Sequence, residues 1–183
     1  MEQNRTFSLK ITAGAAAFGD GSHPTTKGAI VALEALAHLQ GVGRALDMGC
    51  GSGVLALQMA YQWHIPVIAA DKEKTAVAAT AENAIENQLG DLITAIRSDG
   101  YDHPLIRQAA PYDVITSNIL ADILVRFSRE LEENLAEEGI AVVSGILQWQ
   151  GNAVIEAFQA VGLTLLQRIT VEDWVTLLWQ KQG

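Results

Sequence analysis

The sequence predicts a single α/β domain with a mainly parallel seven-stranded sheet, an antiparallel last strand, and helices on both faces. Three observations support this fold class. Short apolar runs alternate with segments of helical periodicity along most of the 183 residues, which is typical of a parallel sheet covered on both faces. A glycine-rich turn follows the first strand of this alternation. The last two apolar runs are joined by a short polar turn, so they must be antiparallel, because parallel neighbours need a long crossover.

The individual elements follow from the same patterns. Strands are expected at 44–48, 66–71, 92–97, 112–117, 140–144, 163–169 and 174–179, with a further short strand at 6–12. Helices are expected at 24–38, 53–63, 75–87, 123–136 and 149–161, where apolar residues recur at helical spacing. Ser22 or His23 should lie around the cap of the first helix, with Pro24 in its first turn. Gly139 and Gly162 are expected to close the last two helices.

The glycine-rich turn is the strongest single indication of a binding site. It runs Asp47-Met48-Gly49-Cys50-Gly51-Ser52-Gly53. A strand that ends in such a turn lets a ligand approach the bare backbone, and the next helix points its free N–H groups at that ligand. In the dinucleotide-binding fingerprint the third glycine falls about five positions after the first. Here Gly53 falls four positions after Gly49. Together with the fixed carboxylate of Asp47, this favours a nucleotide-like ligand that carries an amine beside a carboxylate over one with a pyrophosphate.

Polar residues follow four of the expected strands. Asp47 and Asp71 end the first two strands, Asp99 follows the third, and Asn118 follows the fourth. Each residue alone could merely cap a loop. Asp71 comes about twenty residues after Gly49, which is where a carboxylate binds the two ribose hydroxyls in a βαβ unit. We therefore expect a ligand at the carboxyl ends of the first, second and fourth strands.

Composition limits the classes of partner and the compartment. The net charge is −9 and the pI is about 4.8, which argues against direct nucleic-acid binding, because that needs clustered Lys and Arg. An acidic body fits a cationic substrate such as a Lys-rich tail, or serves solubility alone. The single cysteine allows no internal disulfide, and no metal site is expected. The start of the chain lacks a signal-peptide core and no apolar run reaches ~18 residues, so a cytoplasmic protein without membrane contact is expected.

Four segments together resemble the PrmA family, whose members methylate amino groups of ribosomal protein L-eleven. The segments are Phe18-Gly19-Asp20-Gly21-Ser22-His23-Pro24-Thr25-Thr26, the glycine turn at 47–53, Ser117-Asn118-Ile119-Leu120-Ala121-Asp122, and Ser144-Gly145-Ile146-Leu147. The resemblance covers about residues 9 to 180. It implies a Rossmann-like class I methyltransferase fold, S-adenosyl-L-methionine as cofactor, and N-methylation of a protein substrate with exposed amino groups.

The resemblance also implies roles for individual residues. Thr26 is expected to bond the methionine end of the cofactor, Asp71 its ribose hydroxyls, and Asn118 to lie beside the transferable methyl group and the incoming amine. The glycines of the turn that should support the cofactor are Gly49, Gly51 and Gly53. The broader methyltransferase class implies that Asp47 faces the cofactor amino group and Asp99 the adenine edge. His23 is expected either to act as a base or to hold the loop and the helix start.

Several alternatives stay open at this point. Members of the family carry a separate N-terminal domain that docks the ribosomal protein. Only 17 residues precede the Phe18 loop, so we expect one methyltransferase domain over 1–183 with a short lead-in at 1–17. A methyltransferase for a small molecule and a non-catalytic cofactor-binding module are the alternatives, with a dehydrogenase more remote. The acceptor atom, the number of methyl groups added and the oligomeric state are not predicted.

Overall fold

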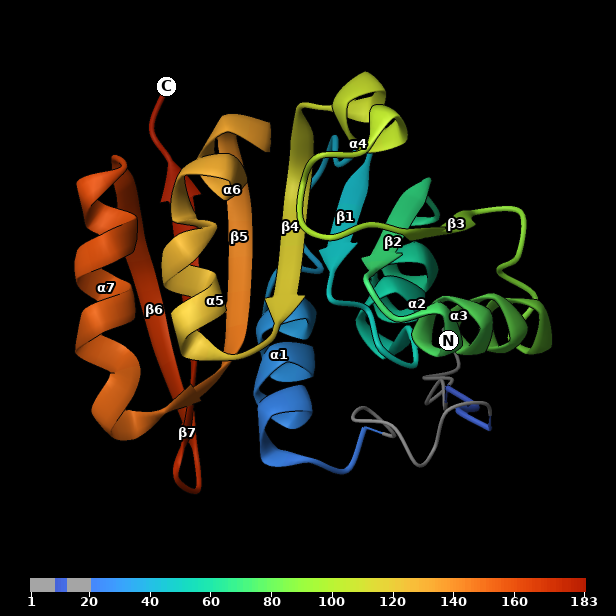
Figure 1. Cartoon of the computed structure of the whole chain (residues 1–183), viewed down its shortest axis with the longest axis horizontal. Coiled ribbons are helices and arrows are strands. Elements are labelled where there is room, and N and C mark those ends of the chain that lie inside the picture. Colours follow the sequence, from blue (N-terminus) through green and yellow to red (C-terminus); the bar gives the residue numbers. More distant parts are fainter. Residues whose placement is uncertain (1–8, 13–20) are drawn as a thin grey trace, which may run out of the picture.

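A computed structural model describes residues 9–12 and 21–183 (Figure 1). Its seven-stranded sheet has the order β3-β2-β1-β4-β5-β7-β6. The first five strands pair in parallel, and β7 runs antiparallel to both of its neighbours. The fold class expected from the alternation of strands and helices is therefore confirmed, including the reversed last strand.

The elements alternate along the chain as expected. The strands are β1 Ala45–Met48, β2 Val67–Asp71, β3 Ile93–Arg97, β4 Tyr112–Asn118, β5 Leu135–Leu147, β6 Leu163–Val171 and β7 Trp174–Lys181. The helices are α1 Pro24–Ala35, α2 Val54–Trp63, α3 Lys74–Glu86, α4 Pro104–Ala109, α5 Ala121–Arg126, α6 Ser128–Asn134, the 3-10 helix η1 Gln148–Gln150, and α7 Gly151–Ala160. Within the two described ranges, none of these helices combines the length and apolar character needed to cross a bilayer.

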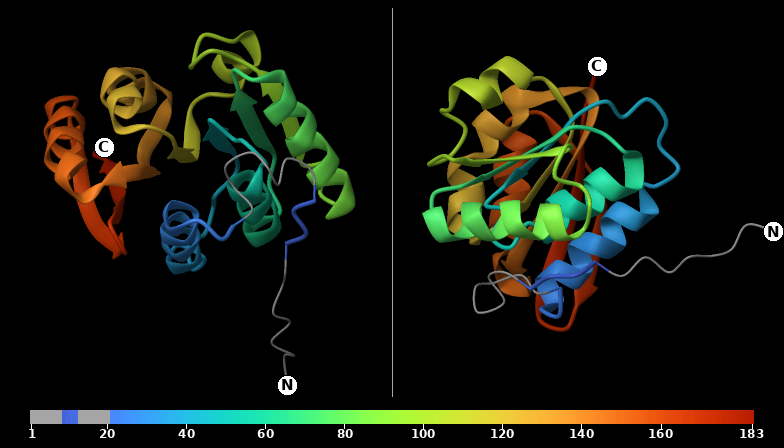
Figure 2. Two further views of the ribbon diagram at one scale, coloured as in Figure 1. Left: turned by 60° about the horizontal axis from the view of Figure 1, so that its bottom comes forward. Right: turned by 90° about the vertical axis from the view of Figure 1, so that its right-hand side faces the viewer.

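The helices form two layers, one on each face of the sheet (Figure 2). One apolar core lies between the sheet and α1, α2 and α3, and includes Leu33, Leu55 and Ala84. The other lies between the sheet and α4 to α7, and includes Leu124 and Phe158. Because both faces are covered, the central strand β1 is buried along its whole length.

The sheet order places the reversal of winding between β1 and β4. From β1 the chain winds outward to β2 and β3, then returns to β4 on the other side of β1. In open parallel sheets a ligand binds at the carboxyl ends of the strands at such a switch point. The loops that follow β1, β2 and β4 meet at this edge of the sheet (Figure 1).

The expected helix at 123–136 is formed except for an interruption at Phe127 and its last two residues. The chain forms two short helices that meet at Phe127, and β5 already begins at Leu135. Leu131 and Leu135 are both buried, and their spacing of four residues suits one helix face. Leu135 instead pairs with Tyr112 of β4, so sheet pairing prevails over the helical pattern. Gly139 consequently lies within β5 and closes no helix, whereas Gly162 does follow the end of α7.

Helix α4 was not anticipated. It has six residues, which is too short for a visible helical period, and it begins with His103 as the cap and Pro104 in the first turn. The side chain of His103 accepts a hydrogen bond from the backbone N–H of Leu105. His23 and Pro24 begin α1 in the same way, so the His-Pro pair is a start signal that this chain uses twice.

The expected strand at 6–12 is not formed where the structure describes it. Residues 6–8 lie outside the described ranges, and residues 9–12 have no strand partner. The apolar residues of the alternating pattern are nevertheless partly buried, because Leu9 and Ile11 pack against the core beside α3. The backbone of this segment bonds side-chain amides of α3 in place of a neighbouring strand.

Candidate functional site

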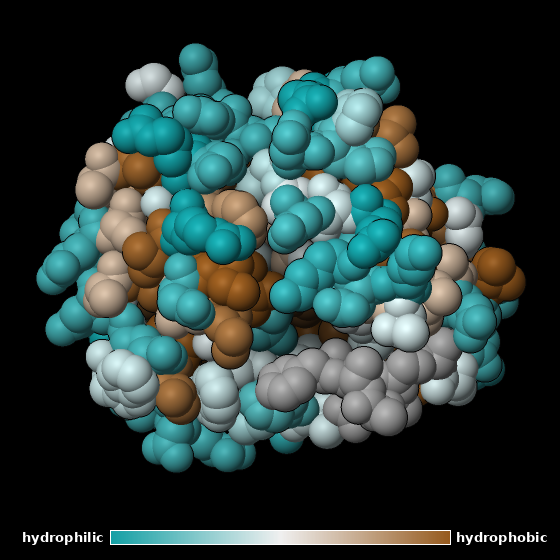
Figure 3. Space-filling model, viewed as in Figure 1, coloured by the Kyte–Doolittle hydropathy of each residue, from teal (hydrophilic) through white to brown (hydrophobic). Residues whose placement is uncertain are grey.

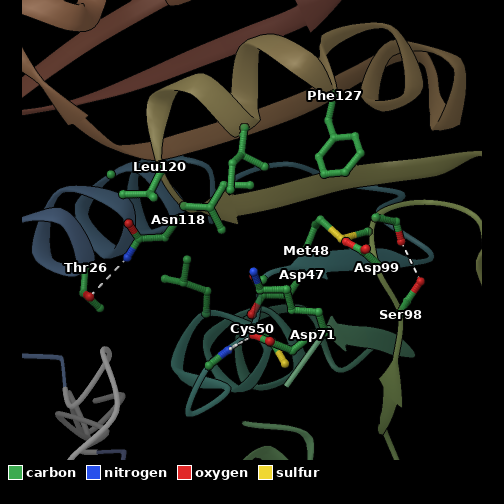
Figure 4. A pocket seen from close by; sticks show the side chains of 18 of the residues that line it. Thr26, Asp47, Met48, Cys50, Asp71, Ser98, Asp99, Asn118, Leu120 and Phe127 are labelled. Carbon is green, nitrogen blue, oxygen red and sulfur yellow. Dashed lines mark hydrogen bonds between the residues drawn. The ribbon is translucent and has the colours of Figure 1, made fainter. Parts of the chain in front are cut away.

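A cavity of about 380 Å³ opens at the carboxyl ends of β1, β2 and β4 (Figure 4). Seven of the nine residues expected in the site line it, namely Thr26, Asp47, Gly49, Gly51, Asp71, Asp99 and Asn118. The polar side chains that line it come from separate parts of the chain, which only the fold brings together. Cavities of this size accommodate cofactor-sized small molecules.

Asp71 is the last residue of β2, and its side chain holds the glycine turn in place by a hydrogen bond. Its Oδ2 accepts a hydrogen bond from the backbone N–H of Gly51 at 3.0 Å, and its Oδ1 accepts one from that of Glu73 at 3.0 Å. A carboxylate oxygen has room for two hydrogen bonds. Each oxygen of this half-buried side chain therefore retains one acceptor position, which suits a pair of neighbouring hydroxyls.

Asp47 is buried at the end of β1 and is already bound on both oxygens. Its Oδ1 accepts a hydrogen bond from the Thr116 hydroxyl at 2.7 Å and its Oδ2 accepts one from the backbone N–H of Ala56 at 3.1 Å. Burial raises the pKa of this carboxyl to about 7, the two hydrogen bonds oppose the rise, and the charge of Asp71 adds to it. At neutral pH the cavity thus contains a carboxyl whose charge responds to whatever binds beside it.

We expect Asp47→Asn to change how stability depends on pH. The pKa is about 7 in the folded chain against an ordinary 3.8, so the folded state holds the proton more tightly. The contribution of Asp47 to stability is therefore greatest below pH 3.8 and is lost as the pH rises to 7. The asparagine amide can keep both contacts without this loss. Urea unfolding at pH 5 and 7 should show wild type losing about 2 kcal/mol relative to the variant; parallel changes in the two proteins would contradict the assignment.

Asn118 and Thr26 form one end of the cavity. The side-chain amide of Asn118, at the end of β4, donates a hydrogen bond to the hydroxyl of Thr26 at 3.3 Å. Thr26 is fully buried in the first turn of α1, where the helix dipole favours an anion. Leu120 lies beside this pair (Figure 4), and Gly145 and Trp174 also line the cavity.

The opposite end is built from the loop after β3 and from the junction of α5 with α6. Asp99 is exposed there, and the Ser98 hydroxyl donates a hydrogen bond to the carbonyl of Gly100 at 2.6 Å. The Phe127 ring lies against this loop and meets the ring of Tyr101 edge-on, with centroids 5.8 Å apart. The arrangement offers a flat apolar side chain beside a polar loop, which suits a planar heterocycle.

Two residues expected in the site lie outside the cavity lining. His23 caps α1 with its ring nitrogen, which accepts from the backbone N–H of Thr25, and its ring meets Trp174 edge-on with centroids 5.2 Å apart. Gly53 is the first-turn cap of α2, and a Cβ there would lie 2.8 Å from Thr80. Of the two roles expected for His23, its position supports the structural one.

Several residues that line the cavity are not predicted by any sequence pattern. Phe127 and Trp174 are examples, and the charged residues Lys72 and Arg126 are others. Phe127 faces the cavity because the expected long helix breaks at this residue, which its apolar spacing did not reveal. Trp174 begins β7, and the antiparallel hairpin of β6 and β7 places it at the cavity. No motif or spacing in the sequence connects Trp174 with the glycine turn.

Comparisons with known proteins identify the family of this chain. The family model "Ribosomal protein L11 methyltransferase (PrmA)" matches residues 1–182. A protein of that name from Brucella suis is 38% identical over 170 residues, covering 93% of this chain and 59% of its own length. The chain thus spans somewhat more than half the length of this curated relative.

Solved structures agree with the fold. A ribosomal protein L11 methylase from Lactobacillus delbrueckii subsp. bulgaricus superposes with a TM-score of 0.75 at 25% identity, covering 89% of this chain and 81% of that one. An RNA methyltransferase from Salinibacter ruber, solved with S-adenosyl-L-homocysteine, has a TM-score of 0.64 at 15% identity over 84% and 90% of the chains. Because the family model matches nearly the whole length of this chain, the chain belongs to the ribosomal protein L11 methyltransferase family.

Proposed function

We propose that this chain transfers methyl groups from S-adenosyl-L-methionine to amino groups of a protein, with a ribosomal protein as the acceptor. One observation carries the proposal: a single cavity has Asp71 beside the glycine turn and the Asn118–Thr26 pair at one end. The first feature suits a ribose, and the second suits an amino acid group next to an entering amine. Family membership supports the choice of acceptor.

The residues present fit this cofactor along its length. The two free acceptor positions of Asp71 would take the ribose hydroxyls, and the loop around Asp99 with Phe127 would hold the base. Thr26, at the start of α1, would bond the carboxylate of the methionine part. Asp47 would face the amine of that part through its charge, since its oxygens already bind Thr116 and Ala56.

Methyl transfer requires little of the protein beyond aligning the methyl donor with the entering amine. When bound, the cofactor supplies an electrophilic methyl group on a sulfonium. The amide oxygen of Asn118 would accept a hydrogen of the entering amine and direct its lone pair, and the bond from Asn118 to Thr26 fixes the orientation of that amide. The neighbouring side chains of Leu120 and Trp174 do not ionise, and this apolar surrounding lowers the pKa of an entering ammonium by desolvation.

The outer surface next to this end of the cavity is apolar. Leu120 is 64% exposed and Val125 37% exposed, and Figure 3 shows apolar surface over α5. The chain as a whole carries a net charge of −9. An acidic protein with an apolar entrance fits a lysine side chain, whose aliphatic stem can lie on Leu120 while its cationic neighbours face the acidic surface.

Labelled cofactor offers a direct test. Purified chain is incubated with methyl-labelled S-adenosylmethionine and either purified ribosomal protein of the L11 type or a whole-cell lysate. A labelled protein band supports the proposal, and label in a small metabolite alone would point to a small-molecule methyltransferase. Binding of S-adenosylhomocysteine in calorimetry without any labelled product would point to a non-catalytic module.

Asn118→Ala should separate binding from chemistry. The variant removes the amide that orients the acceptor, so we expect methyl transfer to fall about 30-fold. The affinity for S-adenosylhomocysteine should change less than about fivefold, since the ribose and base contacts stay in place. Single-turnover rates and calorimetry on the same preparation make the comparison. Equal losses in rate and affinity would assign Asn118 to cofactor binding alone.

The affinity for the cationic cofactor should rise with pH. A ligand ammonium beside Asp47 favours the ionised carboxyl, whose pKa before binding is about 7. Between pH 6 and 7.5 the dissociation constant should fall about eightfold, and binding should release protons in this range. Calorimetry in two buffers of different ionisation enthalpy counts those protons. Asp47→Asn should remove the dependence, and if the variant retains it, another group is responsible.

A further inference from the structure

Two side chains on successive turns of helix α3 donate hydrogen bonds to the backbone of the glycine turn. The Thr80 hydroxyl donates a hydrogen bond to the carbonyl oxygen of Gly51 at 3.1 Å. One turn later, the side-chain amide of Asn83 donates to the carbonyl oxygen of Ser52 at 2.8 Å. Asn83 is fully buried. The backbone N–H of Gly51, in the same turn, donates to the carboxylate of Asp71.

The same face of α3 also holds the segment 9–12. Asn87 bonds Lys10 twice, accepting from its backbone N–H at 2.9 Å and donating to its carbonyl oxygen at 2.8 Å. The oxygen of the Asn83 side chain accepts from the backbone N–H of Thr12 at 3.1 Å. A single buried amide therefore connects two parts of the chain that are about forty residues apart, because its nitrogen bonds the turn and its oxygen bonds the segment.

We propose that Asn83 is a positioning residue for the methyl donor, through which segment 9–12 holds the glycine turn in its binding conformation. This inference rests on the proposed function, because it takes the turn to be the donor site. The side-chain amide of Asn83 is planar and rigid, so fixing its oxygen also fixes the direction of its N–H toward Ser52. Leu9 and Ile11 pack against the core and keep the segment in place. Loosening the segment at Thr12 thus loosens the turn without touching the cavity.

Two substitutions at one position isolate the backbone contact. Thr12→Pro removes the N–H that donates to Asn83, and it also removes the contact of the Thr12 hydroxyl with Glu86. Thr12→Val removes only the hydroxyl contact and keeps the N–H. We expect Thr12→Pro to weaken S-adenosylhomocysteine binding about fivefold in calorimetry, and Thr12→Val to bind as wild type does.

A double-variant cycle then tests whether the effect passes through Asn83. Asn83→Ala should weaken binding about tenfold and raise the KM for the methyl donor, while kcat stays within about twofold. Thr12→Pro added to Asn83→Ala should cause no further loss. Ile85→Ala, on the exposed side of the same helix, serves as the control for general effects on α3. If Asn83→Ala does not fold, the comparison between Thr12→Pro and Thr12→Val decides alone.

The outcomes distinguish this inference from the proposed function. Normal binding by wild type together with unchanged binding by Thr12→Pro would overturn the positioning role only. Losses that multiply in the double variant would show that Thr12 acts independently of Asn83 and would also overturn it. Wild type that binds no S-adenosylhomocysteine would overturn the proposed function, and this inference with it.

Discussion

Gly145→Ala should cost about 5 kcal/mol of the free energy of unfolding, because the new methyl group meets backbone that cannot move aside. A Cβ at this position would lie 2.2 Å from the carbonyl oxygen of Ile119 and 2.9 Å from its carbonyl carbon. The backbone of Gly145 also has a φ of +84°, which disfavours any side chain. The residue lies where the register of β5 with β7 shifts, between Val143 and Ile146, as at a β-bulge that bends the strand toward the cavity.

The same substitution should abolish donor binding. The Ile119 side chain packs on Gly49, where a Cβ would lie 2.3 Å from its Cγ2. Any displacement of Ile119 that relieves the overlap therefore also disturbs the glycine turn that would hold the donor. We expect no measurable binding of S-adenosylhomocysteine even under conditions where the variant is folded. Urea unfolding and calorimetry at the same temperature measure the two effects.

Gly162→Ala is the matched control for backbone strain. Gly162 has a φ of +93°, and a Cβ there would meet nothing within 4 Å. This variant should lose only about 1 kcal/mol of stability and should bind normally. Similar losses of stability in the two variants would show that the contact with Ile119 is not the cause.

The sequence was a good guide to residues whose position depends on strand order alone. Asp71 is an example, because a residue at the end of a buried parallel strand must lie at the ligand edge whatever its neighbours do. Thr26 and Asn118 were expected from the motifs that carry them, and the structure joins the two by a hydrogen bond. Sequence alone gave no reason for that contact, because it depends on how α1 packs across the end of β4.

The sequence was a poor guide to how each polar group is used. Asp47 lines the cavity, but both of its oxygens also bind the chain itself, which the motif does not indicate. The free acceptor positions of a carboxylate can be counted only when its partners are known, and one partner of Asp47, Thr116, is 69 residues away in the chain. Burial likewise alternates over residues 9–12, but the backbone partners of residues 10 and 12 are the side-chain amides of Asn87 and Asn83. Periodicity shows which side chains are buried, and it does not identify what the backbone bonds.

Asp71→Ala should weaken S-adenosylhomocysteine binding about a thousandfold. The variant loses two charged hydrogen bonds to the ribose hydroxyls, each contributing about 1.5 kcal/mol, which together account for about 150-fold. It also frees the backbone N–H groups of Gly51 and Glu73, which the carboxylate now holds at 3.0 Å. The loss is therefore larger than the ribose contacts alone would cause, because the turn must be reordered when the ligand binds.

Asp71→Asn separates these two causes. An asparagine keeps one acceptor oxygen for the turn or the ribose, so we expect a loss of about 30-fold, between wild type and Asp71→Ala. Asp99→Ala is the control for a nearby exposed carboxylate in the same cavity, and it should cost less than tenfold because solvent competes for its hydrogen bonds. Adenosine as the titrant narrows the test further, since it carries the ribose but not the amino acid part. If Asp71→Ala weakens S-adenosylhomocysteine but leaves adenosine binding unchanged, Asp71 does not bind the ribose and acts only by holding the turn.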